Sequence, residues 1–196
     1  MPNNIVFVQG SPRKNGNTRA VAAIAMETAR EAGAEVAEID ATKLQFKQPG
    51  CIGCQKCQES EKFECTLGDE LARTVATIPQ YDAIVMATPL YWWSFSAQIK
   101  IFIDRMYSLS KFTDSWEVRS ALSGKTLALL ATAGGPIENN LELLERQWKN
   151  PADIVGCEFR SCLFPLVPPE PGALAKEAAV IEKARDFGRS LASATS

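Results

Sequence analysis

Residues 5–18 read Ile5-Val6-Phe7-Val8-Gln9-Gly10-Ser11-Pro12-Arg13-Lys14-Asn15-Gly16-Asn17-Thr18 and establish the first unit of the fold. Residues 5–8 form a short β-branched and aromatic run, and Gly10, Pro12 and Gly16 interrupt regular structure before an Ala-rich segment from about 17 to 32. This order predicts a strand, a loop and a helix. Gly33 then ends the helix as a C-terminal cap, and residues 35–39 alternate as a second strand does.

Strands and helices keep alternating along the rest of the chain. Residues 83–87 are all apolar, as in a strand buried on both faces of a sheet. We also expect strands over residues 125–132 and 154–163 and helices over residues 69–78, 95–106, 137–148 and 176–191. Because parallel neighbouring strands need crossover connections, the pattern predicts one α/β domain, residues 1–196, with a doubly wound, five-stranded parallel sheet. Ligands of such sheets bind beyond the carboxyl ends of the strands, so we expect the site in the loops after the first, third and fourth strands.

Composition narrows the classes of function. The chain has 196 residues, 46% hydrophobic and 22% charged, with a net charge of −2 and no histidine. No basic cluster suits a phosphate backbone, so a nucleic acid partner is not expected. The lack of histidine excludes Ser-His and Cys-His pairs and favours chemistry carried by a bound cofactor. No apolar run is long enough to span a membrane and the first residues lack signal-peptide features, so we expect no membrane partner and a cytoplasmic location with reduced thiols.

The loop over residues 10–18 has the chemistry of a phosphate site. Amides at a helix start carry partial positive charge, Ser11 and Thr18 bring hydroxyl groups, Asn17 an amide, and Arg13 a charge-assisted donor. The glycine spacing matches neither a Walker loop nor a dinucleotide fingerprint, which disfavours ATP and GTP. A cationic helix-capping turn is the alternative interpretation.

Two further loops complete a resemblance to a known family. Residues 89–93 read Pro89-Leu90-Tyr91-Trp92-Trp93, and residues 132–135 read Thr132-Ala133-Gly134-Gly135. Together with residues 10–18, these loops resemble those of the NAD(P)H-dependent FMN reductases, a flavodoxin-like family, over nearly the whole chain. The resemblance implies a flavodoxin-like sandwich that binds FMN through Ser11, Arg13, Lys14, Gly16, Asn17, Thr18, Pro89, Leu90, Tyr91, Trp92, Trp93, Ala133, Gly134 and Gly135.

Aromatic rings can stack on a flavin and glycines let backbone amides approach it, which agrees with that implication. Core packing or a subunit interface is the alternative role for the three aromatic residues. Asp104 and Arg105 are interpreted as a local ion pair or helix cap without chemistry.

Four of the six cysteines lie in an inserted loop over residues 43–68, as Cys51, Cys54, Cys57 and Cys65. Sulfur atoms at such short spacing can converge, and all-thiolate sets favour iron–sulfur clusters or zinc. The motif is similar to that of the iron–sulfur flavoproteins, a branch of the same family, which implies a 4Fe-4S cluster. Its seven-residue last gap is at the long end of the pattern of that branch, and ferredoxin-type loops have a Pro where Thr66 stands. Zinc and reduced or disulfide-forming cysteines are the alternatives. Cys157 and Cys162 are five apart in an apolar strand and should be buried on opposite faces.

The resemblance implies an oxidoreductase that passes electrons from NAD(P)H or ferredoxin through FMN, and through the cluster, to a small-molecule acceptor such as a quinone or flavin. No catalytic side chain is assigned, because hydride moves between cofactor and substrate. The alternatives are a non-enzymatic flavodoxin-like electron carrier and a thiol or zinc redox sensor. The resemblance also implies a homodimer or homotetramer.

Overall fold

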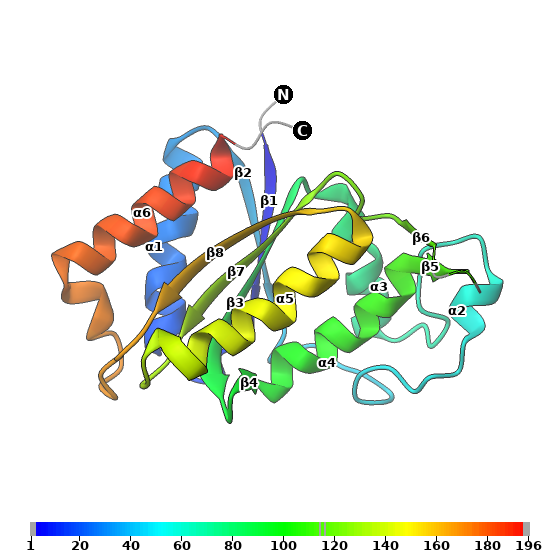
Figure 1. Cartoon of the computed structure of the whole chain (residues 1–196), viewed down its shortest axis with the longest axis horizontal. Helices are drawn as coiled ribbons and strands as arrows, with labels where there is room; N and C mark the ends of the chain where they lie inside the picture. The colour runs from blue at the N-terminus through cyan, green and yellow to red at the C-terminus, as the bar shows by residue number, and fades with distance from the viewer. Residues whose placement is uncertain (1–2, 114, 116, 194–196) are drawn as a thin grey trace.

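The computed structural model describes residues 3–113, 115 and 117–193, and its centre is a parallel sheet with strand order β2-β1-β3-β7-β8 (Figure 1). The strands are β1 (Asn4–Gln9), β2 (Glu35–Asp40), β3 (Ala83–Tyr91), β7 (Thr126–Thr132) and β8 (Glu158–Phe164). A short strand β4 (Ser94–Phe95) folds back antiparallel on β3. The predicted flavodoxin-like fold with five parallel strands is therefore confirmed.

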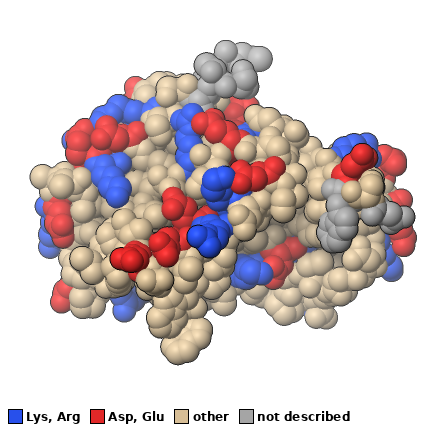
Figure 2. All heavy atoms as spheres, in the orientation of Figure 1, with Lys and Arg blue, Asp and Glu red and all other residues tan. Residues whose placement is uncertain are grey.

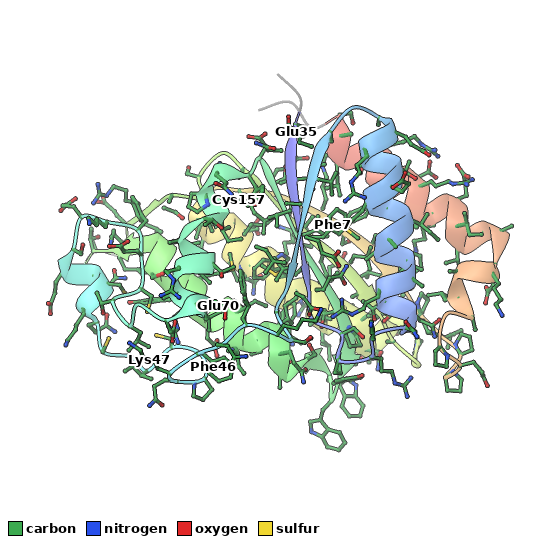
Figure 3. All side chains as sticks on the ribbon, turned by 180° about the vertical axis from the view of Figure 1, so that it is seen from behind. Phe7, Glu35, Phe46, Lys47, Glu70 and Cys157 are labelled. Carbon is green, nitrogen blue, oxygen red and sulfur yellow. The ribbon has the colours of Figure 1, made fainter. Side chains whose placement is uncertain are left out.

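Helices cover both faces of the sheet. On one face lie α1 (Asn17–Glu31) and α6 (Ala178–Ala192); on the other lie α3 (Glu70–Ala76), α4 (Ala97–Arg105) and α5 (Glu142–Val155) (Figure 1). The middle of β1, residues 5–8, is apolar because both of its faces are covered: Ile5 and Phe7 pack toward α1 and α6, while Val6 and Val8 pack toward the other three helices. Figure 3 shows Phe7 in the first of these layers.

The helices α1 and α6 approach closely because Gly188 has no side chain. A Cβ atom there would lie 2.4 Å from the backbone oxygen of Ala25. Figure 2 shows acidic and basic side chains interspersed over one face of the molecule, without a large patch of one sign. No helix within the described residues is both long and apolar enough to cross a membrane.

Two predicted boundaries were wrong because tertiary packing overrides the local pattern. The helix predicted to end at residue 148 follows a kinked segment, η3 (Ile137–Leu141), in which Glu138 and Asn139 are not helical, and it continues as α5 through Pro151 to Val155. Burial of Trp148 and Ala152 in the core holds this last part, and Gly156, with φ of +74°, ends the helix in the left-handed region. Strand β8 therefore begins at residue 158 rather than 154.

The first turn of α4 also differs from the prediction. The helix begins at Ala97, and residues 106–109 continue it as a 3₁₀ turn, η2. Ser96 precedes the helix, but its hydroxyl donates to the carbonyl oxygen of Gly10 at 2.6 Å instead of capping the helix. Ser96 thereby joins α4 to the loop after β1.

Several short elements had no clear sequence signal. They are α2 (Lys56–Glu59) within the cysteine loop, the hairpin of β5 (Ser110–Phe112) and β6 (Val118–Ser120), and the 3₁₀ turns η1 (Ile78–Gln80) and η4 (Leu174–Lys176). The hairpin lies beside α2 at one end of the molecule (Figure 1). A two-stranded hairpin is marginal by itself, so its contacts with the cysteine loop matter to both.

Candidate functional site

A cavity of about 220 Å³ opens at the carboxyl ends of β1, β3 and β7. The predicted residues that line it are Ser11, Arg13, Gly16, Asn17, Thr18, Pro89, Leu90, Tyr91, Ala133 and Gly134. The lining also includes Thr132, Val167, Pro168 and Pro169. Three loops that are distant in sequence therefore meet at one site, as the topology of a doubly wound sheet requires.

The start of α1 is open to an anion. No side chain caps its first turn, and this turn contains no acidic residue. A Cβ atom at Gly16 would lie 2.9 Å from the Cβ of Arg13, so only glycine lets the loop turn this tightly. Backbone N–H groups with a positive dipole end thus face the cavity, which is the arrangement that binds a phosphate group. The residues present fit the phosphate of FMN.

The side chain of Asn17, which lines the cavity, also makes contacts within the protein. Its amide nitrogen donates to the carbonyl oxygens of Pro168 at 2.9 Å and Glu170 at 3.0 Å, and its oxygen accepts from the backbone N–H of Leu174 at 3.0 Å. Asn17 thus fastens a Pro-rich segment beside the cavity, and Arg13 reaches the same segment through the carbonyl oxygen of Pro169 at 3.3 Å. No role was assigned to this segment from the sequence; it lies between the last predicted strand and the last predicted helix.

Two polar contacts hold residues 10–18, here called the phosphate loop, in place. The hydroxyl groups of Thr18 and Thr132, both buried, are 2.7 Å apart, so they join α1 to the end of β7. Behind the loop, Arg19 donates to the carbonyl oxygen of Ser11 at 3.2 Å and pairs with Asp40 at 2.8 Å. Burial of Asp40 acts to raise its pKa, but hydrogen bonds from Thr42, Arg19 and Lys43 outweigh it and hold the pKa well below its ordinary range.

The tryptophan pair lies outside the cavity lining. Trp92 is 89% exposed and Trp93 is 48% exposed, and both adopt positive φ angles of 49° and 56° in the turn between β3 and β4. Such a conformation costs free energy in a non-glycine residue. Two contacts to the neighbouring segment fix it: Trp93 donates from Nε1 to the carbonyl oxygen of Asn139, and Gln147 donates to that of Trp93, each at 3.2 Å.

Two more predicted residues also lie outside the lining. Lys14 lines a separate surface groove, and Gly135 packs against the side chain of Asn140. A Cβ atom at Gly135 would lie 2.8 Å from the amide nitrogen of Asn140. Gly135 therefore shapes the loop rather than the cavity surface.

The four loop cysteines line a second, small cavity of about 20 Å³ together with Arg105. Three of their sulfur atoms accept hydrogen bonds: Cys51 from Gly53 N–H at 3.4 Å, Cys57 from Gln58 at 3.5 Å, and Cys65 from Arg105 at 3.4 Å. Across the part of the chain that the structure describes, no three Cys, Asp or Glu side chains stand close enough to hold a metal ion. The thiols line one cavity, but in the arrangement that the structure describes they do not converge on a point where they could hold a metal ion together.

Arg105 is the residue that sequence reasoning missed. Asp104 forms the local ion pair that was expected, with Lys100 one turn earlier, but Arg105 is buried and pairs with Asp69 at 3.1 Å. Burial of Asp69 acts to raise its pKa, whereas hydrogen bonds from Lys47, Ala72 and Arg105 lower it by more. No local pattern reveals this pair, because its partners are 36 residues apart.

The two remaining cysteines lie on opposite faces of the sheet, as predicted. Cys157 packs with the core of α3, α4 and α5, and Cys162 packs with that of α1 and α6. Burial raises the pKa of Cys157 to about 11 and that of Cys162 to about 12. Both thiols are therefore protonated at neutral pH and poor nucleophiles.

Residues 3–145 match the family described as NADPH-dependent FMN reductase. The chain belongs to this family. Among curated relatives, the FMN reductase chain is 30% identical over 136 residues to an iron-sulfur flavoprotein of Archaeoglobus fulgidus and 28% identical over 138 residues to one of Methanocaldococcus jannaschii. These alignments cover 68% and 70% of this chain, and 57% and 67% of the relatives' own lengths. The chain thus spans less than two thirds of the first relative.

Solved structures share the fold of this FMN reductase family member. An NAD(P)H:quinone oxidoreductase from Methanothermobacter marburgensis has a TM-score of 0.73 at 18% identity, with 97% of this chain and 100% of that chain covered. An FMN-dependent NADH-azoreductase from Bacillus anthracis in complex with FMN has a TM-score of 0.69 at 12% identity, with 97% and 98% covered. At such identities the likeness concerns the fold alone.

Proposed function

We propose that the chain is an FMN-dependent oxidoreductase that takes electrons from NAD(P)H or ferredoxin and delivers them to a small acceptor such as a quinone or a flavin. The observation that carries the proposal is the cavity in which the loops after β1, β3 and β7 meet. Membership of the NADPH-dependent FMN reductase family supports the same cofactor. FMN, when bound, accepts two electrons as a hydride and releases them one at a time.

The phosphate end of the site lies at the start of α1. The uncapped N–H groups of its first turn and the hydroxyl of Ser11 would donate to the phosphate oxygens, and Arg13 at the rim would add positive charge. The bond between Thr18 and Thr132 holds α1 against β7 before any ligand binds. The site is therefore preorganised, which lowers the entropic cost of binding.

The ring end of the site lies between two loops. Pro89, Leu90 and Tyr91 form one wall, and Ala133 and Gly134 form the other. A Cβ atom at Gly134 would meet nothing within 4 Å, so backbone amides there stay accessible to a planar ring. Tyr91 is half-exposed and can stack on that ring, while the Trp92–Trp93 turn stands outside, where a second substrate must approach.

The finer proposal is that Cys51, Cys54, Cys57 and Cys65 hold a 4Fe-4S cluster. Its support is that they line one cavity, that three of the sulfur atoms accept hydrogen bonds, and that the two curated relatives above are named iron-sulfur flavoproteins. N–H···S bonds of this kind tune such centres. Electron transfer would then run one electron at a time between flavin and cluster.

The test is an absorption spectrum of anaerobically purified protein, with iron and acid-labile sulfide measured on the same sample. Flavin bands with about four irons per chain are expected, as four cysteine ligands imply. Cys65→Ser should lose iron and keep FMN, whereas the matched control Cys162→Ala, a buried thiol outside the loop, should keep both. Flavin without iron would overturn the cluster, zinc in its place would favour the redox sensor, and absence of flavin after reconstitution would overturn the whole proposal.

Turnover distinguishes the enzyme from a carrier. Steady oxidation of NADH or NADPH with a quinone or free flavin is expected from FMN-loaded protein. Reduction in a single stoichiometric step without turnover would favour the flavodoxin-like electron carrier.

A further inference from the structure

The cavity proposed for FMN, here called the flavin cavity, has a wall that comes from neither the phosphate loop nor the ends of β3 and β7. This wall is part of residues 165–173, here called the strap, and consists of Val167, Pro168 and Pro169. Figure 1 shows the strap between the carboxyl end of β8 and the start of α6. The match to the FMN reductase family ends at residue 145, so the family match does not account for this wall.

The strap begins at the ring end of the flavin cavity, where backbone hydrogen bonds hold it. The N–H of Leu166 donates to the carbonyl oxygen of Gly135 at 3.0 Å. The N–H of Val167 donates to the carbonyl oxygen of Ala133 at 2.9 Å. The first residues of the strap are thus bonded to the loop after β7 without the help of a side chain.

A side chain attaches the middle of the strap. Pro168 and Pro169 have no N–H groups, so this part of the strap offers carbonyl oxygens only. The amide nitrogen of Asn17 donates to the carbonyl oxygens of Pro168 at 2.9 Å and Glu170 at 3.0 Å. Its amide oxygen accepts from the N–H of Leu174, directly after the strap, at 3.0 Å. Asn17 therefore fastens the strap to the start of α1.

These three bonds use the amide of Asn17 completely. An amide side chain has two N–H donors and one oxygen, and all three groups have partners here. The residue is also only 8% exposed. No N–H group of this side chain is then left for a phosphate oxygen. Ser11 differs, because its hydroxyl makes one long bond, at 3.4 Å to the carbonyl oxygen of Arg13, and can turn to a ligand.

We propose that the strap retains FMN in the flavin cavity and that Asn17 is the positioning residue that fastens it. The inference rests on the proposed FMN site. The strap runs from the loop after β7 to the start of α1, so it spans the ring end and the phosphate end. A wall that is fixed before binding loses little conformational entropy when the ligand enters, and it must move before the ligand leaves. Loosening the strap therefore accelerates flavin dissociation whether or not the flavin carries a phosphate.

The test compares FMN with riboflavin, which has the same ring and ribityl chain but no phosphate. Flavin-free protein is titrated with each by fluorescence quenching, and dissociation rates are measured by stopped flow. Asn17→Ala removes all three bonds and keeps a good helix former at the start of α1. It should weaken both flavins by a similar factor, on the order of 10-fold, as expected for one or two net hydrogen bonds, mostly through faster dissociation.

Three further variants give this result its meaning. Ser11→Ala removes a hydroxyl proposed to donate to the phosphate, so it should weaken FMN and leave riboflavin unchanged. The double variant Pro168→Gly with Pro169→Gly leaves Asn17 in place but makes the strap flexible, so it should weaken both flavins. Asn150→Ala is the matched control: it makes the same change at an exposed position of α5 outside the flavin cavity, and both affinities should stay unchanged.

Hydrogen exchange adds a measurement that does not need riboflavin. Bound FMN should slow exchange of the N–H groups of Val167 and Leu174 in the wild type. In Asn17→Ala, the N–H of Leu174 loses its acceptor and should exchange faster. Exchange in the strap that is the same with and without FMN would overturn the inference.

The outcomes separate this inference from the function on which it rests. If the wild type binds neither flavin after reconstitution, the proposed FMN site is overturned, and the inference with it. If Asn17→Ala weakens FMN but not riboflavin, Asn17 is a phosphate ligand and only its role through the strap is overturned. Unchanged affinities for both flavins overturn that role as well. If circular dichroism shows that Asn17→Ala does not fold, the double glycine variant decides, and unchanged dissociation of both flavins from it overturns the strap.

Discussion

The flavin cavity and the cysteine loop are built by different means. The cavity lies at the carboxyl ends of three parallel strands, so the backbone of the sheet places most of its residues. The cysteine loop contains one short helix and owes its shape to side chains from elsewhere, above all Arg105 and Lys111. The first region should therefore tolerate the loss of one side-chain contact, whereas the second should not.

Removal of Arg105 is expected to have the largest effect. Arg105→Met leaves the carboxylate of Asp69 buried without its cation, and breaking a buried pair in this way costs about 3–5 kcal/mol of unfolding free energy. Urea denaturation followed by circular dichroism measures this. FMN affinity should change little, because the hydrogen-bond partners of Arg105 among the described residues all lie outside the flavin cavity.

A neighbouring ion pair on the same helix provides the control. Lys100→Met removes the exposed i, i+4 pair with Asp104, which is worth about 0.3–0.5 kcal/mol. Equal losses for Arg105→Met and Lys100→Met would contradict the idea that side-chain attachments hold the cysteine loop.

The hydrogen bond between Thr18 and Thr132 allows the same kind of test at the flavin cavity, where one side-chain contact is removed and the loss of unfolding free energy is measured. Thr18→Val leaves the buried hydroxyl of Thr132 without its partner, which should cost about 1–3 kcal/mol. The double variant with Thr132→Val removes both hydroxyl groups and should cost less than the two single variants together. Denaturation of the wild type, the two single variants and the double variant gives a double-mutant cycle. Losses of unfolding free energy that simply add would show that the two hydroxyl groups do not interact in solution.

The same contrast explains what the sequence could predict. The loop between β1 and α1 was predictable as part of the cavity because its donors, its glycines and the start of α1 are neighbours in the sequence. The first and third strands followed from short apolar runs such as residues 83–87, the second followed from the alternation of residues 35–39, and the observed strand order is flavodoxin-like. Local patterns therefore suffice wherever the backbone of the sheet does the positioning.

The features of the site that the sequence did not predict depend on contacts between residues far apart in the chain, and such contacts leave no local pattern. Asn17 was predicted as a ligand for phosphate, and no pattern in the sequence indicated that its side chain also binds a segment more than 150 residues away, which brings Pro168 and Pro169 to the cavity. Arg105 was expected to make only a local ion pair or a helix cap, because the carboxylate with which it pairs lies far away in the sequence. The oligomeric state and the electron donor stay predictions from the family resemblance.

The smallest expected effect concerns Asp40, which supports the phosphate loop from behind through Arg19. Its ordinary pKa is 3.8 and its pKa in the fold is lower, so its contribution to stability is complete above about pH 4 and is lost as the pH falls through the folded pKa. Asp40→Asn should therefore cost on the order of 1 kcal/mol of unfolding free energy at pH 7, and the difference from the wild type should shrink at pH 3.

The control for this prediction is Glu38→Gln, which changes the other carboxylate near Arg19. That pair is longer, 3.9 Å, and Glu38 is more exposed, so the loss should be within about 0.5 kcal/mol at either pH. Denaturation at pH 7 and pH 3 measures both variants. A loss of unfolding free energy in Asp40→Asn that is the same at both pH values would mean that the shape of the Asp40 side chain matters rather than its charge. The ion pair with Arg19 would then not support the loop after β1.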